Sequence, residues 1–243
     1  MHPRVLLLSG NAMVSRLMTT AMVSRSWDVI SIEVMVYDLA RMTSAAEAQV
    51  VLAQAKPNYV IFAAGSMSNP FAVDRDAAKS FMHASTAAPS VTKFLFFSFP
   101  GSRRNRAPWW SEKEYEQFLS EKNSFPDIYQ AKLEADEYLV ALAEKRIKEG
   151  GPPFQAISLR PTWMTNSRGT GKVRLGRAGA RGQVTRQDVA AVAVGLLSRN
   201  DTHGWFDLFQ GDVEIEEAIE MAVQGAINSI EGEDIERMCK LLQ

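Results

Sequence analysis

The N-terminal residues set the fold class, and they read Val5-Leu6-Leu7-Leu8-Ser9-Gly10-Asn11-Ala12-Met13-Val14-Ser15. The opening apolar run is typical of a short strand that is buried on both faces. After the turn at Gly10, apolar residues recur at helical spacing as far as Met22 and predict a helix with one apolar face. A strand, a tight glycine turn and a helix in this order indicate the first part of a βαβ unit.

Strand and helix patterns alternate along the rest of the chain. Strands are predicted at residues 29–37, 59–64, 93–99, 154–159, 172–175 and 204–208, and helices at residues 44–56, 74–87, 112–122, 129–148, 187–198 and from 214 onward. This alternation predicts an α/β fold with a mostly parallel sheet and helices on both faces. We expect one Rossmann-like domain over residues 1–243, in which residues 160–243 contribute the substrate-side loops and the C-terminal helices. Ligands of such sheets bind beyond the carboxyl ends of the strands.

The composition narrows the range of partners. The chain has 243 residues, 46% of them hydrophobic, and a net charge of -1, which allows a large core and gives no electrostatic case for a nucleic acid or an anionic membrane. The single cysteine, Cys239, cannot form an internal disulfide, and no His, Cys and carboxylate cluster has metal-ligand spacing. No apolar run approaches the length of a membrane span. We therefore expect a cytoplasmic protein that binds a small-molecule substrate and no metal, with a homo-oligomer left open.

Several motifs in the chain resemble those of one family. They are Ser98 after a Phe-rich strand, the Arg- and Trp-rich loop at residues 102–110, the helix around Lys132, the sequence Leu159-Arg160-Pro161, and the stretches at residues 169–176 and 184–190. Together they resemble the atypical short-chain dehydrogenase/reductases, and most of all the fungal NmrA-like and biliverdin-reductase-B-like group. The resemblance covers nearly the whole chain and is most specific from Asp74 onward. It implies a Rossmann fold, a nicotinamide cofactor and a catalytic Tyr–Lys pair.

The phosphate-binding loop departs from the family pattern. A dinucleotide loop has the form G-x-G-x-x-G because glycines permit the tight turn, the approach of the pyrophosphate and close packing of helix on strand. The stretch from Gly10 to Ser15 keeps only the first glycine, and Ala12 adds a Cβ where the pyrophosphate would approach. We therefore expect the cofactor site, formed by Gly10, Asn11, Ala12 and Gly65, to be degraded. No bound cofactor is the preferred expectation, and weak binding of NADP or NAD is the alternative.

The segment after the second strand is another departure. The family places an arginine loop there for the 2′-phosphate of NADP, followed by a further helix and strand. Residues 29–37 instead read as strand throughout, and a parallel crossover needs about a dozen or more residues. We expect the sheet to lack one family crossover after the second strand. Glu33 lies either where an acid would bind the ribose hydroxyls or on an outward face of the strand.

The catalytic helix is the third departure. The Tyr of the family precedes its Lys by four residues, so that both project from one helical face and the Lys lowers the pKa of the Tyr. Lys132 is present, but Ile128 occupies the position of the Tyr. Tyr129 lies only three residues before Lys132 and reaches the site if the helix is rotated. The candidate catalytic residues are therefore Ser98, at the end of a strand, and Lys132, with Tyr129 in reserve.

Large and basic side chains are candidates for the substrate pocket. Arg103, Trp109 and Trp110 follow the Phe-rich strand, and Trp163 lies where the loop of the family covers the nicotinamide. The tryptophans form either an apolar pocket wall or contacts that hold a loop to the core. For Arg103 the alternative is a solvated loop face. Asp74 is expected to cap a helix.

Three classes of function remain open. The altered loop, the missing crossover and the absent Tyr favour a redox-inactive enzyme that acts on a small secondary metabolite, as an isomerase, cyclase, dehydratase or rearrangement catalyst. Such an enzyme would use the pocket above Gly10, Gly65, Ser98 and Lys132 without a cofactor. The alternatives are an NAD(P)H-dependent reductase and a non-enzymatic NmrA-like sensor or binding protein.

Overall fold

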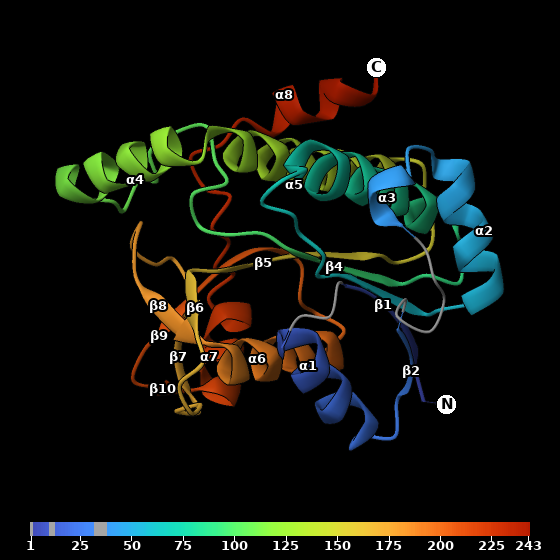
Figure 1. Ribbon diagram of the computed structural model, residues 1–243, viewed down its shortest axis with the longest axis horizontal. Coiled ribbons are helices and arrows are strands. Elements are labelled where there is room, and N and C mark those ends of the chain that lie inside the picture. The colour runs from blue at the N-terminus through green and yellow to red at the C-terminus, as the bar shows by residue number, and fades with distance from the viewer. Residues whose placement is uncertain (1, 10–12, 32–37) are drawn as a thin grey trace.

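The computed structural model describes residues 2–9, 13–31 and 38–243, and within them an eight-stranded sheet forms the centre of the molecule (Figure 1). Its strands are β1 (Arg4–Leu8), β2 (Asp28–Ser31), β3 (Tyr59–Phe62), β4 (Lys93–Phe97), β5 (Gln155–Pro161), β7 (Lys172–Gly176), β9 (Gly204–Gln210) and β10 (Val213–Glu214). They are arranged in the order β10-β7-β9-β5-β4-β3-β1-β2. The strands from β9 to β2 are parallel, whereas β7 and β10 run antiparallel to their neighbours.

Helices cover both faces of this sheet (Figure 1). On one face lie α1 (Met13–Val23), α6 (Arg186–Ser198) and α7 (Ile215–Gln224), and on the other lie α2 (Ala45–Ala55), α3 (Ala78–Ala87), α5 (Pro126–Lys148) and α8 (Ile235–Cys239). Val5 and Leu7 pack into the core beneath α1 and α6, whereas Leu6 and Leu8 pack into the core beneath α2, α3 and α5. Because both faces are covered, β1 is apolar in nearly every position. The fold predicted from the sequence is confirmed.

Smaller elements complete the chain. They are the short helices η1 (Leu39–Arg41), η2 (Phe71–Ala77) and η3 (Lys240–Leu242), the helix α4 (Glu112–Ser124), and a parallel pair of strands, β6 (Trp163–Thr165) and β8 (Gln183–Thr185). Ser44 and Ser111 start α2 and α4 with capping boxes, in which each serine bonds the Glu three residues later. None of the described helices is long and apolar enough to cross a membrane.

The β2 edge of the sheet shows how the fold differs from the usual dinucleotide-binding arrangement. β2 pairs with β1, and the chain then passes through α2 to β3, which pairs with the other side of β1. The usual order is 3-2-1-4-5-6, so among the described residues this edge has one crossover fewer, in agreement with the sequence. The strand expected over residues 29–37 is described as far as Ser31. Its continuation, with Glu33, lies outside the described residues.

Two helical segments differ from the sequence pattern. The helix expected from residue 74 begins at Phe71 with the π-helical segment η2, and the residue before it, Pro70, makes no side-chain cap. Asp74 therefore lies inside a helical turn rather than at its start. The C-terminal segment is also less helical than expected, because α7 ends at Gln224 and turns occupy residues 225–234 before α8.

Candidate active site

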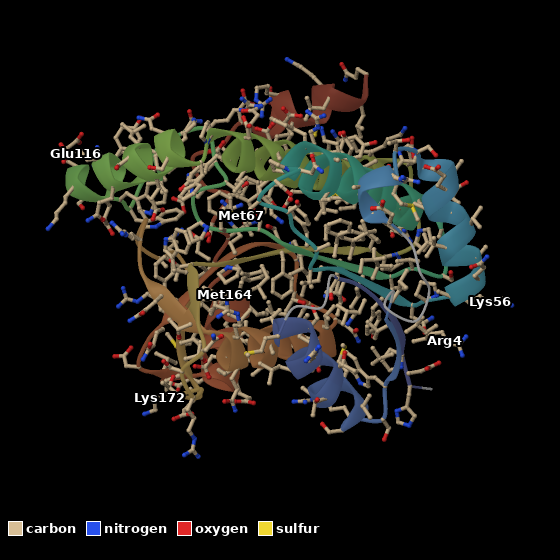
Figure 2. All side chains as sticks on the ribbon, viewed as in Figure 1. Arg4, Lys56, Met67, Glu116, Met164 and Lys172 are labelled. Carbon is tan, nitrogen blue, oxygen red and sulfur yellow. The ribbon has the colours of Figure 1, made fainter. Side chains whose placement is uncertain are left out.

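A cavity of about 450 Å³ lies beyond the carboxyl ends of β3, β4 and β5. Its walls come from the turns after these strands, from α4 and α5, and from β6. Met67, which follows β3, and Met164, on β6, both line it (Figure 2). The fold predicts a ligand at this edge of the sheet, and the volume lies within the range of small-molecule pockets, roughly 300–1,000 Å³.

A buried ion pair lines this cavity. Lys132 comes from α5 and Asp74 from η2, and the Lys132 Nζ lies 3.0 Å from the Asp74 Oδ1. The same Nζ donates to the backbone oxygen of Phe97 over 2.6 Å. An ammonium group carries three N–H donors. The ammonium group is thus held by an ion pair and a hydrogen bond, and it also lies 4.6 Å from the centre of the Phe96 ring.

Asp74 is a site residue that the sequence pattern assigned to a helix cap. Its side chain is buried, and its Oδ2 accepts a hydrogen bond from the backbone N–H of Ser66 over 2.8 Å. Gly65, at the wall of the cavity, allows this approach, since a Cβ there would lie 3.0 Å from the Asp74 Oδ1. Short π-helical segments such as η2 are rare and are frequent at functional sites. The carboxylate therefore serves Lys132 and the turn after β3.

Ser98 lies directly after β4 and lines the cavity, but its hydroxyl is bound to a buried carboxylate. The Ser98 Oγ donates to the Asp136 Oδ2 over 2.5 Å. Asp136, on α5, also accepts hydrogen bonds from Ser102, Ser158 and Arg160. The proton of Ser98 is thus held within the protein, and the oxygen of this side chain is left as an acceptor for a ligand.

Tyr129 also lines the cavity, but its hydroxyl points to α4 rather than to Lys132. It donates to the Glu121 Oε2 over 3.2 Å, and its ring packs edge-on against Phe99. Burial, followed by the negative charge of Glu121, raises the pKa of Tyr129 above its usual value. In the short-chain dehydrogenase/reductases that the sequence resembles, the neighbouring Lys lowers the pKa of the catalytic Tyr. This geometry disfavours proton transfer by a Tyr–Lys pair.

The remaining wall of the cavity is mostly apolar. It includes Phe99, Phe125, Ile128, Pro161, Trp163 and Met164. Trp163 lies at the cavity, as the sequence predicted, and its Nε1 donates to the Glu121 Oε1 over 2.9 Å. Its ring lies edge-on to Phe125. Ile128, at the position of the family Tyr, contributes an aliphatic side chain to this wall.

Arg103, Trp109 and Trp110 do not line the cavity, which corrects the position expected for them. Arg103 is buried and donates to the backbone oxygen of Ser229, so it joins the loop after β4 to the C-terminal segment. Both indoles donate to the backbone oxygen of Ala178. The guanidinium carbon of Arg103 lies 5.3 Å from the centre of each indole ring. These side chains hold loops together, which was the alternative reading for the tryptophans.

The phosphate-binding loop is described only in part. Gly10, Asn11 and Ala12 lie outside the described residues, so their effect on a pyrophosphate stays a prediction. Ser15, at the third glycine position, is buried in α1, and its hydroxyl has no hydrogen-bond partner in the described part of the chain. A side chain therefore fills the space between α1 and the sheet where the family has a glycine.

The described residues fit the nicotinamide half of a dinucleotide. Ala63, Ala64 and Gly65 are small and line the cavity at the end of β3. Lys132 lines the same cavity, and its ammonium group is a hydrogen-bond donor. The described residues contain no group of three or more His, Cys, Asp or Glu side chains that would hold a metal ion.

Glu121 and Asp136 are site residues that the sequence analysis missed. Asp136 lies four residues after Lys132 and so on the same face of its helix. That spacing is a usable signal. Glu121 lies among several acids in a helix with one buried residue, Phe118, and its partners are distant in sequence. No local pattern separates it from its acidic neighbours.

A mostly parallel sheet with helices on both faces and a cavity beyond the carboxyl ends of its strands places the fold in the Rossmann-like α/β class, although its β2 edge has one crossover fewer than usual. A family model described as NAD(P)H-binding matches residues 19–200. The chain belongs to this NAD(P)H-binding family. A UPF0659 protein of Schizosaccharomyces pombe is 30% identical in an alignment 179 residues long, and the alignment covers 69% of this chain and 68% of that protein.

Solved structures of oxidoreductases share the fold. The oxidoreductase ylbE from Lactococcus lactis matches with a TM-score of 0.69 and 19% identity, over 90% of this chain and 96% of that chain. A wide-type short-chain dehydrogenase/reductase from Veillonella parvula, in complex with NADP, matches with a TM-score of 0.59 and 13% identity, over 88% of this chain and 97% of that chain. At these identities the likeness concerns the fold.

Proposed function

We propose that this protein is an NAD(P)H-dependent reductase of a small conjugated molecule and that it works without a tyrosine proton donor. The observation that carries the proposal is the pairing of the family Lys and of the nearest tyrosine with acids, Lys132 with Asp74 and Tyr129 with Glu121. Membership of the NAD(P)H-binding family supports a nicotinamide cofactor. The position of the cavity at the strand ends supports the same ligand. When bound, the cofactor supplies a hydride.

In this proposal Lys132 binds and orients the substrate or the cofactor. Its ammonium group donates to an oxygen of the substrate or to a ribose hydroxyl, and Asp74 holds the ammonium group in place. A fixed positive charge stabilises negative charge that develops on a substrate oxygen. Ser98 accepts a hydrogen bond from a substrate hydroxyl or amide, because its own proton is held by Asp136.

The choice of substrate class follows from the available acids. A saturated ketone that takes up a hydride becomes an alkoxide and needs a proton from a nearby acid. Tyr129 is a poor donor because its pKa is raised, and the proton of Ser98 is engaged. In a quinone or an enone the added negative charge is delocalised, so the product takes its proton from water. The apolar wall of the cavity also suits such molecules.

A conversion without net redox change is the second candidate. It is favoured by the altered phosphate loop, in which Ala12 replaces a glycine and Ser15 fills the packing position. The reaction would then be an isomerisation, cyclisation, dehydration or rearrangement of a small metabolite. Lys132 would stabilise the developing charge in the same place.

The two candidates differ in whether nicotinamide is consumed. The purified protein is mixed with NADPH or NADH and either 2-methyl-1,4-naphthoquinone, a planar conjugated acceptor, or cyclohexanone, a saturated one. Loss of nicotinamide absorbance is followed against a reaction without protein. We expect protein-dependent oxidation with the quinone and none with cyclohexanone. If a fluorescence titration shows no binding of NADPH or NADH, the reductase proposal is excluded and the conversion without net redox change remains.

A matched pair of double variants tests the site. Asp74→Asn with Lys132→Met removes the buried pair while keeping its volume, and we expect the rate to fall roughly 10²-fold, as for the loss of a donor at a developing oxyanion. Lys172→Met with Glu214→Gln removes an exposed ion pair far from the cavity. This control pair should leave the rate unchanged. Equal rates in both double variants would remove Lys132 from the mechanism.

A further inference from the structure

One carboxylate joins two aromatic side chains that belong to different parts of the cavity wall. Glu121, in the last turns of α4, accepts from the Tyr129 hydroxyl with one oxygen and from the Trp163 indole with the other. Tyr129 belongs to α5 and Trp163 to β6. The Nε of Arg181 lies 3.6 Å from the Glu121 Oε1 and partly balances its charge. Both oxygens of the carboxylate are thus in use.

These bonds determine what the rings present to a ligand. The polar atoms of Tyr129 and Trp163 are both engaged with Glu121, so the rings contribute carbon surface to the cavity. Phe99 packs on Tyr129, and Phe125 packs on Trp163, which extends the aromatic surface on each side. Aromatic rings pack best against other flat ring systems in stacked or edge-on arrangements.

Trp163 depends on Glu121 for its position. Its side chain is 56% exposed and stands on a strand of three residues. Its ring donates a hydrogen bond to Glu121 and lies edge-on to Phe125. A hydrogen bond to a charged acceptor is stronger than one between neutral groups. Removal of the carboxylate therefore frees an exposed indole to change its rotamer.

α4 does not need Glu121 to hold its own place. Ser111 and Glu114 form the capping box at its start, and Phe118 packs against Trp110 and Tyr129. The carboxylate is therefore directed at the cavity wall and not at the anchoring of the helix.

We infer that Glu121 is a positioning residue that sets the two aromatic walls of the cavity and thereby selects planar, conjugated ligands over puckered, saturated ones. The inference rests on the proposed function, since it names the shape of the substrate for the same cavity. It concerns binding and is tested without nicotinamide, so its failure is separate from a failure of the reductase proposal.

The experiment compares the affinity for one planar and one puckered ligand of similar size. The dissociation constants of 2-methyl-1,4-naphthoquinone and of 2-decalone are measured by calorimetry for the natural protein, Glu121→Ala, Glu121→Gln and the control Glu116→Ala. Glu116 is exposed on the same helix and is labelled in Figure 2. We expect the preference for the planar ligand to fall about tenfold or more in Glu121→Ala, the size of a lost hydrogen bond to a charged group. In Glu121→Gln the preference for the planar ligand should be intermediate, because the single amide oxygen keeps one acceptor. In Glu116→Ala the preference should equal that of the natural protein.

A spectroscopic measurement separates positioning from a general loosening of the fold. The fluorescence of Trp163 is obtained as the difference between each protein and its Trp163→Phe counterpart. Acrylamide should quench this difference signal more strongly in Glu121→Ala than in Glu116→Ala. The inference is overturned if folded Glu121→Ala keeps the ligand preference within about twofold, or if Glu116→Ala loses it equally. If Glu121→Ala does not fold, unchanged preference and quenching in Glu121→Gln overturn it.

Discussion

At the scale of single residues, the free energy of unfolding depends on the buried pair of Lys132 and Asp74. Both side chains are buried, and their charged atoms lie 3.0 Å apart. Removing one partner leaves an uncompensated buried charge, which costs about 3–5 kcal/mol, whereas replacing both with groups of similar volume is often neutral. We expect Lys132→Met to lower the free energy of unfolding by that amount. Adding Asp74→Asn should restore most of the loss.

Urea unfolding measures both effects. The matched control is Lys79→Met, which breaks a half-buried ion pair between Lys79 on α3 and Glu134 on α5. It should cost about 1 kcal/mol or less, because partly exposed pairs contribute little. A Lys132→Met protein as stable as Lys79→Met would show that the Lys132–Asp74 pair contributes no more to stability than a partly exposed pair.

Asp207 makes stability depend on pH. It lies on β9, its Oδ1 accepts from Arg160, and its Oδ2 is buried without a partner in the described part of the chain. Burial raises the pKa of Asp207 from 3.8 to about 7, although Arg160 opposes the rise. The folded protein therefore keeps a proton that the unfolded chain releases between these values. The stability that this proton contributes is full below pH 3.8 and is lost as the pH rises through 7.

The difference between the natural protein and Asp207→Asn isolates this effect. Between about pH 4 and about pH 7 we expect the free energy of unfolding to fall, relative to the variant, by about 1.4 kcal/mol per pH unit. Above that interval the difference should be constant. A difference that rises with pH would mean that Asp207 is ionised in the folded protein at acidic pH.

At the scale of elements, the face of α5 toward the cavity decides the acid chemistry. Ile128 lies about one helical turn before Lys132 and lines the cavity, whereas Tyr129 is turned toward Glu121. If the proposed function is correct, Ile128→Tyr should add the missing proton donor and allow reduction of cyclohexanone by NADPH. Ile128→Phe is the matched control and should not. We expect at least a tenfold difference between the two variants, since general acid catalysis contributes about 10²–10⁴-fold.

We predict that the segment between β1 and α1 limits the affinity for a dinucleotide. Ala12 and Ser15 replace glycines that permit the approach of a pyrophosphate and close helix packing. We expect NADP to bind more weakly than micromolar, and Ala12→Gly with Ser15→Gly to strengthen it. Nicotinamide fluorescence in a titration of NADPH measures both proteins. Micromolar affinity in the natural protein, about −8 kcal/mol, would contradict this expectation.

Features with a local sequence pattern were predicted, whereas contacts between distant residues were not. β1, α1 and the later alternation carry local apolar patterns, so a mostly parallel sheet with helices on both faces was predicted from them. Lys132 was found because helical spacing is local. Arg103 was placed wrongly because its partner, Ser229, lies 126 positions away, and no local pattern shows that contact. Asp74 has the local appearance of a cap, but its partner Lys132 lies on another helix.

At the scale of the whole molecule, residues 160–243 complete the core that the N-terminal half begins. β9 pairs with β5 within the parallel part of the sheet, and α6 packs against α1. Arg160 bonds Asp136 on α5 and Asp207 on β9 through buried contacts. The N-terminal part cannot keep its native surface when these residues leave, because the edge of β5 and the apolar face of α1 would both be exposed to water.

The expected single domain over residues 1–243 can therefore be tested as a single cooperative unit. We expect one thermal transition, with a calorimetric enthalpy about equal to the van't Hoff enthalpy, because no boundary near residue 160 leaves two independently buried cores. The Arg160→Met variant tests whether the two parts still unfold together when a buried link between them is removed. It leaves Asp136 and Asp207 without their shared partner, so the transition should move to lower temperature but remain single. Two resolved transitions, in either protein, would show that the N-terminal and C-terminal parts unfold separately and that the chain contains two domains.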